Sequence, residues 1–235
     1  MKIVVKIGGH VIAPQFSSRR FKAYATLLRK LRDEGHRIIV VTGGGEEARK
    51  FIRVAKKLGG TEFICDIIGI DVSRLNARLL ITGLGDDAYP EPPITIGDLR
   101  KAFEGDKIVV VGGLQPGQST NAVGILIAEA VGADLFINST NVDGVYTSDP
   151  KKDVNAKKLD VVTTDELLDL TLNERLEAGG YALFDPVAIK LVERSGIPTR
   201  IVDGRNPQNI ELAIRGEAIG TLIKTSRGIS NDEPC

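Results

Sequence analysis

The chain has 235 residues, 42% of them hydrophobic, and its 31 lysines and arginines balance 31 aspartates and glutamates. That length suits one large domain or two small ones, and the charge balance argues against a protein that binds nucleic acid mainly by neutralising phosphates. No uninterrupted apolar run approaches the roughly 18 residues that cross a bilayer, and the first residues lack the features of a signal peptide. The two cysteines, Cys65 and Cys235, provide neither a disulfide framework nor a zinc site. We therefore expect a cytoplasmic protein with no membrane or nucleic-acid partner.

Short runs rich in valine and isoleucine recur along the chain and predict strands. These runs are residues 2–7, 37–42, 107–112, 134–138 and 199–202. Between them apolar residues recur at helical spacing. The helices expected from that spacing are 19–34, 46–58, 66–82, 121–131, 165–170 and 185–195. Asp185 and Pro186 give the last helix a typical beginning. This alternation predicts an α/β fold in which helices cover both faces of a mainly parallel sheet.

No linker rich in proline or serine interrupts the alternation of strands and helices. This favours a single domain that comprises residues 1–235. Residues 83–106 contain several glycines and prolines, so an exposed excursion from the domain is one interpretation of them. Residues 225–235 are expected to form a flexible tail.

Glycine clusters follow three of the expected strands. The clusters are Gly8-Gly9, Gly43-Gly44-Gly45 and Gly112-Gly113. The carboxyl ends of parallel strands meet at one edge of a sheet, where main-chain N–H groups and helix N-termini can approach phosphate oxygens. Any one cluster is equally compatible with a tight strand-to-helix turn, but three together indicate a polyphosphate site.

Two of these clusters partly match known phosphate-binding motifs. Residues 112–119, GGLQPGQS, have the glycine frame of a P-loop, but Gln118 stands where that loop has its lysine, which argues against a P-loop NTPase. Residues 43–48, GGGEEA, fit the dinucleotide-binding pattern, with Glu62 and Asp66 roughly 20 residues further on. A dinucleotide-binding oxidoreductase is therefore an alternative, although the pattern follows the second expected strand rather than the first.

Lys6 is the candidate catalytic residue. It lies near the end of the first expected strand, just before Gly8-Gly9. At that position a lysine ammonium can bridge the β- and γ-phosphates of a nucleotide. The alternative is a solvated lysine on an edge strand.

Five segments together resemble the amino-acid kinase superfamily, and most closely its archaeal UMP kinases. They are KIGG (6–9), VVTGGGEEAR (40–49), CDIIGID (65–71), GGLQPGQSTNAV (112–123) and TNVDGVYTSDP (140–150). The resemblance runs from residue 1 to about 224, and its most specific part is TNVDGVYTSDP after the GGxxPG loop. It implies a three-layer αβα sandwich and a transferase that moves the γ-phosphoryl group of MgATP to UMP in pyrimidine nucleotide biosynthesis. It also implies a homo-oligomer, a hexamer.

The resemblance implies roles for individual residues. The ATP site would contain Lys6, Ile7, Gly8, Gly9, His10, Gly44 and Arg49 near the phosphates, and Thr140, Asn141, Tyr146 and Asp149 near adenine and ribose. The UMP site would contain Gly43, Asp66 for the ribose hydroxyls, and the loop residues Leu114, Gln115, Pro116, Gly117, Gln118, Ser119 and Thr120. No residue is assigned as a metal ligand, because Asp143, which precedes Gly144, is equally compatible with a turn. Mg²⁺ would enter with ATP as the substrate complex, and no tightly bound cofactor is expected.

The residue types suit phosphoryl transfer. The phosphate of UMP is already an anionic nucleophile, so the reaction needs in-line positioning and charge neutralisation rather than a general base. The chain departs from the family pattern at His10, often serine, at Asn121, commonly aspartate, and at Asn138, where bacterial relatives have lysine.

The sequence is also compatible with other functions. Within the superfamily they are the kinases of acetylglutamate, aspartate and carbamate, which form acyl phosphates, and of isopentenyl phosphate. Isopentenyl phosphate kinases have a histidine shortly after the GGG cluster. The segment GGGEEARKF has none, which disfavours isopentenyl phosphate as the acceptor. A non-catalytic nucleotide-binding relative is the alternative outside enzymes.

Overall fold

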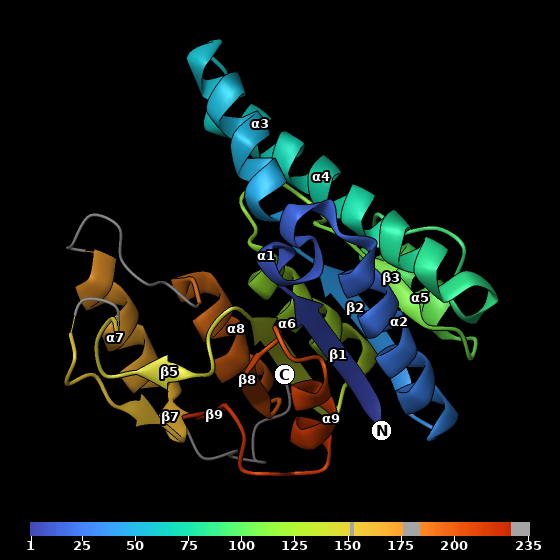
Figure 1. Cartoon of the computed structure of the whole chain (residues 1–235). Coiled ribbons are helices and arrows are strands. Elements are labelled where there is room, and N and C mark those ends of the chain that lie inside the picture. The colour runs from blue at the N-terminus through green and yellow to red at the C-terminus, as the bar shows by residue number, and fades with distance from the viewer. Residues whose placement is uncertain (151–152, 176–183, 227–235) are drawn as a thin grey trace, which may run out of the picture.

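The computed structural model describes residues 1–150, 153–175 and 184–226, with a seven-stranded sheet at its centre (Figure 1). The strands follow the order β3-β2-β1-β4-β8-β9-β7, and every neighbouring pair is parallel except β8 and β9. Their bounds are β1 Lys2–Ile7, β2 Arg37–Thr42, β3 Val109–Val111, β4 Leu135–Thr140, β7 Val161–Thr163, β8 Thr199–Asp203 and β9 Thr221–Lys224. A separate antiparallel pair joins β5 Val145–Tyr146 to β6 Lys158–Leu159.

Helices cover both faces of this sheet. One layer consists of α1 Gly9–Ile12, α2 Ser18–Asp33, α4 Glu62–Leu84 and α9 Gln208–Ile214. The other consists of α5 Ile96–Phe103, α6 Thr120–Val131, α7 Thr164–Arg175 and α8 Pro186–Ser195. Helix α3, Gly45–Lys57, packs on α4, and the two project together from the body (Figure 1). Short 3₁₀ turns occupy Pro14–Phe16 and Gly85–Asp87. The predicted αβα sandwich is confirmed.

Strand β1 lies inside the sheet, between β2 and β4. Its side chains alternate between two cores: Ile3, Val5 and Ile7 face α2 and α4, whereas Val4 faces α6 and α8. Strands that are buried on both faces are near-continuous apolar runs, as KIVVKI is. Lys6 shares the α6 face with Val4 and is 9% exposed. The interpretation of Lys6 as a solvated residue on an edge strand is therefore wrong.

Residues 83–106 are not the exposed excursion that their glycines and prolines suggested. They contain α5, whose Leu99, Ala102 and Phe103 are buried in the core beneath α6. Apolar residues at this i, i+3, i+4 spacing place one helix face against the sheet. Thr95 caps the helix, because its hydroxyl oxygen accepts a hydrogen bond from the Asp98 N–H at 3.0 Å.

Two further differences concern element ends. Helix α4 begins at Glu62, four residues before the expected helix, because Thr61 caps it by accepting from the Ile64 N–H. At the C-terminus, Ser226 is hydrogen-bonded to Thr164 and to the Asp165 N–H, both at 3.0 Å, so this part of the expected tail is anchored. Residues 227–235 of that tail lie outside the described residues. No helix in the described ranges is both long and apolar enough to cross a membrane.

Candidate active site

A cavity of about 350 Å³ lies at the carboxyl ends of β1, β2 and β4. Its lining comes from the ends of β1 and β4, the turns that follow β1, β2 and β4, α1, the first two turns of α3 and the first turn of α6. The lining residues are Lys6, Gly8, Gly9, His10, Val11, Gly43, Gly44, Gly45, Arg49, Thr120, Asn121, Thr140 and Asn141. Ten of them belong to the predicted nucleotide sites; Val11, Gly45 and Asn121 do not. Among these lining residues, three have basic side chains (Lys6, His10 and Arg49) and none has a carboxylate, which favours an anionic ligand.

The first two glycine turns pack backbone against backbone. A Cβ atom on Gly9 would lie 2.5 Å from the Cα of Gly45, and one on Gly43 would lie 2.8 Å from the nitrogen of Gly9. Gly45 also has φ +70°, a left-handed conformation that favours glycine. Any side chain at Gly9 would force the two turns apart. The glycines therefore let two strand ends approach closely enough to surround one ligand.

The third glycine cluster has another role. A Cβ atom on Gly112 would lie 2.6 Å from the Arg74 nitrogen, and one on Gly113 would lie 2.9 Å from Cγ1 of Ile70, both on α4. The Gly113 N–H also donates to the Ser73 hydroxyl at 2.7 Å. These glycines allow β3 to pack against α4, and neither lines the cavity. The expectation that all three clusters face the phosphates is therefore wrong for Gly112-Gly113.

Lys6 lies at the floor of the cavity. Its stem passes Gly124 of α6, where a Cβ atom would lie 2.5 Å from the Phe136 ring and 3.7 Å from Cβ of Lys6. Its ammonium lies beside Gly8. Burial lowers the pKa of Lys6 from its usual 10.5 to about 8, and the Asp185 carboxylate opposes that shift. An ammonium with this pKa keeps its charge at neutral pH and gains strongly from an approaching phosphate.

Asp185 makes more contacts than the helix cap that its sequence position predicts. It was predicted only as a helix cap, and it does cap α8 by accepting from the Ala188 N–H at 3.0 Å. Its other oxygen accepts from the Ser119 hydroxyl, and Ser119 in turn caps α6. Asp185 is also the carboxylate that acts on Lys6. One side chain therefore connects the starts of α6 and α8 to the candidate catalytic lysine, and no sequence spacing indicates this.

His10 and Arg49 complete the basic lining. Burial lowers the pKa of His10, the charges of Arg49 and Lys6 lower it further, and Glu46 opposes them. Arg49 is exposed and lies in the second turn of α3. Since the N-termini of α3 and α6 both begin at this cavity, their main-chain dipoles add to the positive potential.

Asp66 lies on α4 and holds the loop between β3 and α6. Its Oδ2 accepts a hydrogen bond from the Gly117 N–H at 2.8 Å. Arg74, also on α4, donates to the carbonyl oxygens of Gly113 and Leu114 at 3.1 and 3.2 Å. Asp66 is not the cap of α4, because Thr61 has that position. The loop predicted to surround uracil is therefore tied to α4 at its start and at its middle.

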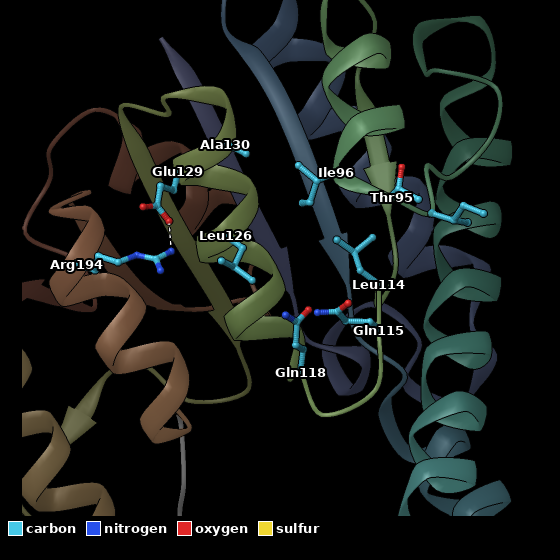
Figure 2. Close-up of a pocket in the computed structure, with 10 residues that line it drawn as sticks. Thr95, Ile96, Leu114, Gln115, Gln118, Leu126, Glu129, Ala130 and Arg194 are labelled. Atoms are coloured by element: carbon cyan, nitrogen blue, oxygen red, sulfur yellow. Dashed lines mark hydrogen bonds and ion pairs between the residues drawn. The ribbon is translucent and has the colours of Figure 1, made fainter. Parts of the chain in front are cut away.

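Part of this loop lines a second cavity of about 840 Å³ on its other side. Figure 2 shows Gln115 and Gln118 with their amides directed toward each other, and the ion pair of Glu129 with Arg194 across from them. The lining is completed by Ile94, Thr95, Ile96, Leu114, Leu126 and Ala130. The predicted UMP residues Leu114, Gln115 and Gln118 thus line this second cavity and not the basic one, and Pro116 and Gly117 connect the two glutamines in sequence.

Three predicted ATP residues also lie outside the basic cavity. Ile7 is fully buried in the α2 core. Tyr146 lies on β5 and its hydroxyl donates to Asp143 at 3.0 Å, and Asp149 lies in the segment that follows. Neither Tyr146 nor Asp149 is in the lining.

The dinucleotide alternative fails on geometry. It requires an acidic residue at the end of a strand, where a ribose would lie. Glu62 and Asp66 both lie in helix α4 instead. In the described ranges no three His, Cys, Asp or Glu side chains are grouped in a way that could hold a metal ion.

A parallel α/β sheet with a glycine-rich, basic cavity at its strand ends defines a protein that binds phosphorylated ligands. The model of the amino acid kinase family matches residues 1–203, and the chain belongs to that family.

Proteins named uridylate kinase are similar to nearly the whole chain. The one from Methanocella arvoryzae is 50% identical over 224 residues, covering 95% of this chain and 100% of that protein. The one from Methanothermobacter thermautotrophicus is 48% identical over 223 residues, covering 95% and 99%. The crystal structure of uridylate kinase from Archaeoglobus fulgidus superposes with a TM-score of 0.85 at 38% identity, covering 95% of this chain and 100% of that one.

Proposed function

We propose that this protein is a UMP kinase, which transfers the γ-phosphoryl group of MgATP to UMP and yields UDP and ADP in pyrimidine nucleotide biosynthesis. The observation that carries the proposal is the meeting of Lys6, the Gly8-Gly9 turn and the Gly43–Gly45 turn around one cavity. The similarity to uridylate kinases over 94% or more of the chain supports the choice of UMP over the acceptors of other amino acid kinases.

In the proposed reaction an oxygen of the UMP phosphate attacks the γ-phosphorus of ATP. A new P–O bond forms, the bond from the γ-phosphorus to the bridging oxygen breaks, and ADP leaves with that electron pair. Lys6 neutralises charge on the moving group, and Gly44 presents its main-chain N–H group to the donor phosphate. Gly43, whose own N–H donates to the Ile7 carbonyl at 2.9 Å, lines the cavity where the acceptor phosphate would lie. Mg²⁺ arrives with ATP and shields the phosphates.

Asp185 supports Lys6 in this reaction. Its carboxylate opposes the effect of burial and so helps the ammonium keep its proton. Because Asp185 is also fixed by Ser119 and the Ala188 N–H, it offers Lys6 a stationary partner. The result is a preorganised positive charge, which costs little reorganisation when the phosphoryl group moves.

A panel of phosphate acceptors tests the proposed function. Purified protein with MgATP is expected to phosphorylate UMP with a higher kcat/KM than CMP, AMP, isopentenyl phosphate or N-acetylglutamate, measured as ADP formed. A panel in which another acceptor has the highest kcat/KM contradicts the proposal. A protein that binds ATP and UMP but forms no ADP contradicts it too, and favours a non-catalytic relative.

Asp66→Asn is expected to weaken UMP binding with little change in kcat. The proposed ribose contact uses the free carboxylate oxygen, while the other oxygen holds Gly117. Loss of a hydrogen bond to a charged group corresponds to about 1.5–3 kcal/mol, so KM for UMP should rise at least about tenfold. Asp71→Asn is the matched control, since Asp71 is exposed on the same helix. An unchanged KM for UMP in Asp66→Asn removes Asp66 from the site.

We also propose that Thr140, Asn141, Tyr146 and Asp149 bind adenosine, and that the whole chain is one domain that assembles into a homo-oligomer, a hexamer. Exposed apolar side chains on the projecting pair α3 and α4 support assembly, because monomers rarely expose such a group. They are Phe51, Val54, Leu58, Phe63 and Ile64. The mass of the protein in solution tests this.

A further inference from the structure

Asn138 of β4 is fully buried, and neither polar atom of its side chain, Nδ2 or Oδ1, has a hydrogen-bond partner among the described residues. Other buried polar side chains of the sheet do have partners. Thr42 donates to the Ser73 carbonyl at 2.8 Å, Ser139 pairs with the Tyr24 hydroxyl at 3.0 Å, and Thr199 donates to the Ile197 carbonyl at 3.0 Å. A buried amide without partners destabilises a fold, so its presence requires an explanation.

The sheet register places this amide beside the candidate catalytic lysine. Asn138 is the direct partner of Lys6 across the parallel pair of β4 and β1, and the partner of Ile201 on its other side. Partners in register project to the same face, about 5 Å apart. On that face Phe136 and Ile201 are part of the apolar core. Lys6 is thus the polar neighbour that the strand pairing gives to Asn138.

We propose that Asn138 is a positioning residue for Lys6: its amide oxygen turns toward the ammonium and holds it charged and directed at the phosphates. This inference rests on the proposed function, because it gives Asn138 a purpose in phosphoryl transfer. The amide acts through its dipole and touches no reacting atom. The amide makes no hydrogen bond in this structure, so the proposed contact forms by rotation of the Asn138 side chain toward Lys6.

Few charged groups surround Lys6, so the influence of Asn138 on the pKa of Lys6 can be measured. Asp185 faces it from α8, while His10 from α1 and Arg49 from α3 share its cavity. Glu46 of α3 acts on His10. The nearest residues of β2 and α6, Val41 and Gly124, carry no charge. The pKa of Lys6, about 8, places its titration within an accessible pH range.

Asn138→Leu is the central test. Leucine has a similar size and no polar atoms, so the ligand-free variant should melt at the same temperature as the wild type or higher. At the same time kcat should fall at least about tenfold, with KM for UMP unchanged. The alkaline limb of kcat/KM for ATP should move to lower pH than in the wild type, because the ammonium loses the proposed amide partner. Ser139→Ala, a change on the opposite face of the same strand, should leave that limb in place.

The pKa of Lys6 can also be read without activity. In protein labelled with ¹³C at lysine Cε, the Lys6 signal, assigned by its loss in Lys6→Arg, should titrate at lower pH in Asn138→Leu than in wild type. Asn138→Asp should move it to higher pH. If the wild type shows the Lys6 titration but does not phosphorylate UMP, the proposed function fails while this test still decides the role of Asn138. An unchanged Lys6 titration in Asn138→Leu, or a lower melting temperature with an unchanged pH limb, overturns the inference and leaves Asn138 a structural residue.

Discussion

Lys6→Ala is expected to lower kcat by a factor of about 10² to 10³, while KM for UMP changes little. Removal of one preorganised electrostatic donor costs about 2.7–4 kcal/mol of transition-state stabilisation. Lys6 fits that description because it is buried at the floor of the cavity, beside Gly8 and under the influence of Asp185. UMP binding should persist, since its proposed contacts lie on Asp66 and the loop after β3. Steady-state kinetics with each substrate varied in turn make the measurement.

Lys2→Ala is the matched control for that variant. Lys2 lies on the same strand, four residues before Lys6, and its ammonium donates to the Val131 carbonyl at 2.9 Å. Its loss removes a lysine from β1 far from the cavity and should leave kcat within about twofold of the wild type. Equal kcat values for Lys6→Ala and the wild type refute a catalytic role for Lys6.

Gly9→Ala is expected to lower kcat/KM for ATP at least about 100-fold, because it displaces the phosphate-binding backbone. The added Cβ atom would lie 2.5 Å from the Cα of Gly45 and 2.6 Å from the carbonyl carbon of Gly44, and backbone atoms cannot move aside as a flexible side chain does. The two turns must separate, and a displacement of about 1 Å at a reacting centre costs on the order of 100-fold in rate. Kinetics with ATP and thermal unfolding of the same samples measure both effects.

Gly97→Ala provides the comparison. Gly97 lies in the first turn of α5, where the nearest atom to an added Cβ is 3.7 Å away. That substitution should leave kcat/KM unchanged and the melting temperature equal or higher, since alanine favours a helix. Full activity in Gly9→Ala is incompatible with a site formed by the close approach of the two glycine turns.

The fold follows from the sequence where strands are long and fully buried. The runs KIVVKI and RIIVVT carry apolar residues to both faces of the sheet, and both strands lie where predicted. Strands β5, β6 and β9, each of two to four residues, give no periodicity to detect. Helix α5 has a detectable pattern, because Leu99, Ala102 and Phe103 follow helical spacing. The neighbouring prolines and glycines instead indicated an exposed loop.

Helix α3 shows how far periodicity reaches. It lies close to the predicted range 46–58, and its Phe51 is 57% exposed. Periodicity identifies an apolar face but not what covers it.

Only those site residues that lie at strand ends or within contiguous motifs could be predicted from the sequence. Lys6 and the first two glycine clusters belong to contiguous strand-and-turn segments, and these meet at one cavity. Gly112-Gly113 has the same local pattern, but α4 rather than the cavity lies against it. Asp185 and Asn138 come beside Lys6 through the packing of α8 and the register of β4. Contacts between residues more than a hundred positions apart leave no trace in local spacing.

The most direct test of the central claim is a crystal structure of the protein with UMP and a non-hydrolysable ATP analogue. The γ-phosphate should lie about 2.7–3.1 Å from the Lys6 ammonium, in line with the UMP phosphate, inside the cavity formed by the Gly8-Gly9 and Gly43–Gly45 turns. A triphosphate bound outside that cavity, for example in the larger one behind Gln115 and Gln118, contradicts the account.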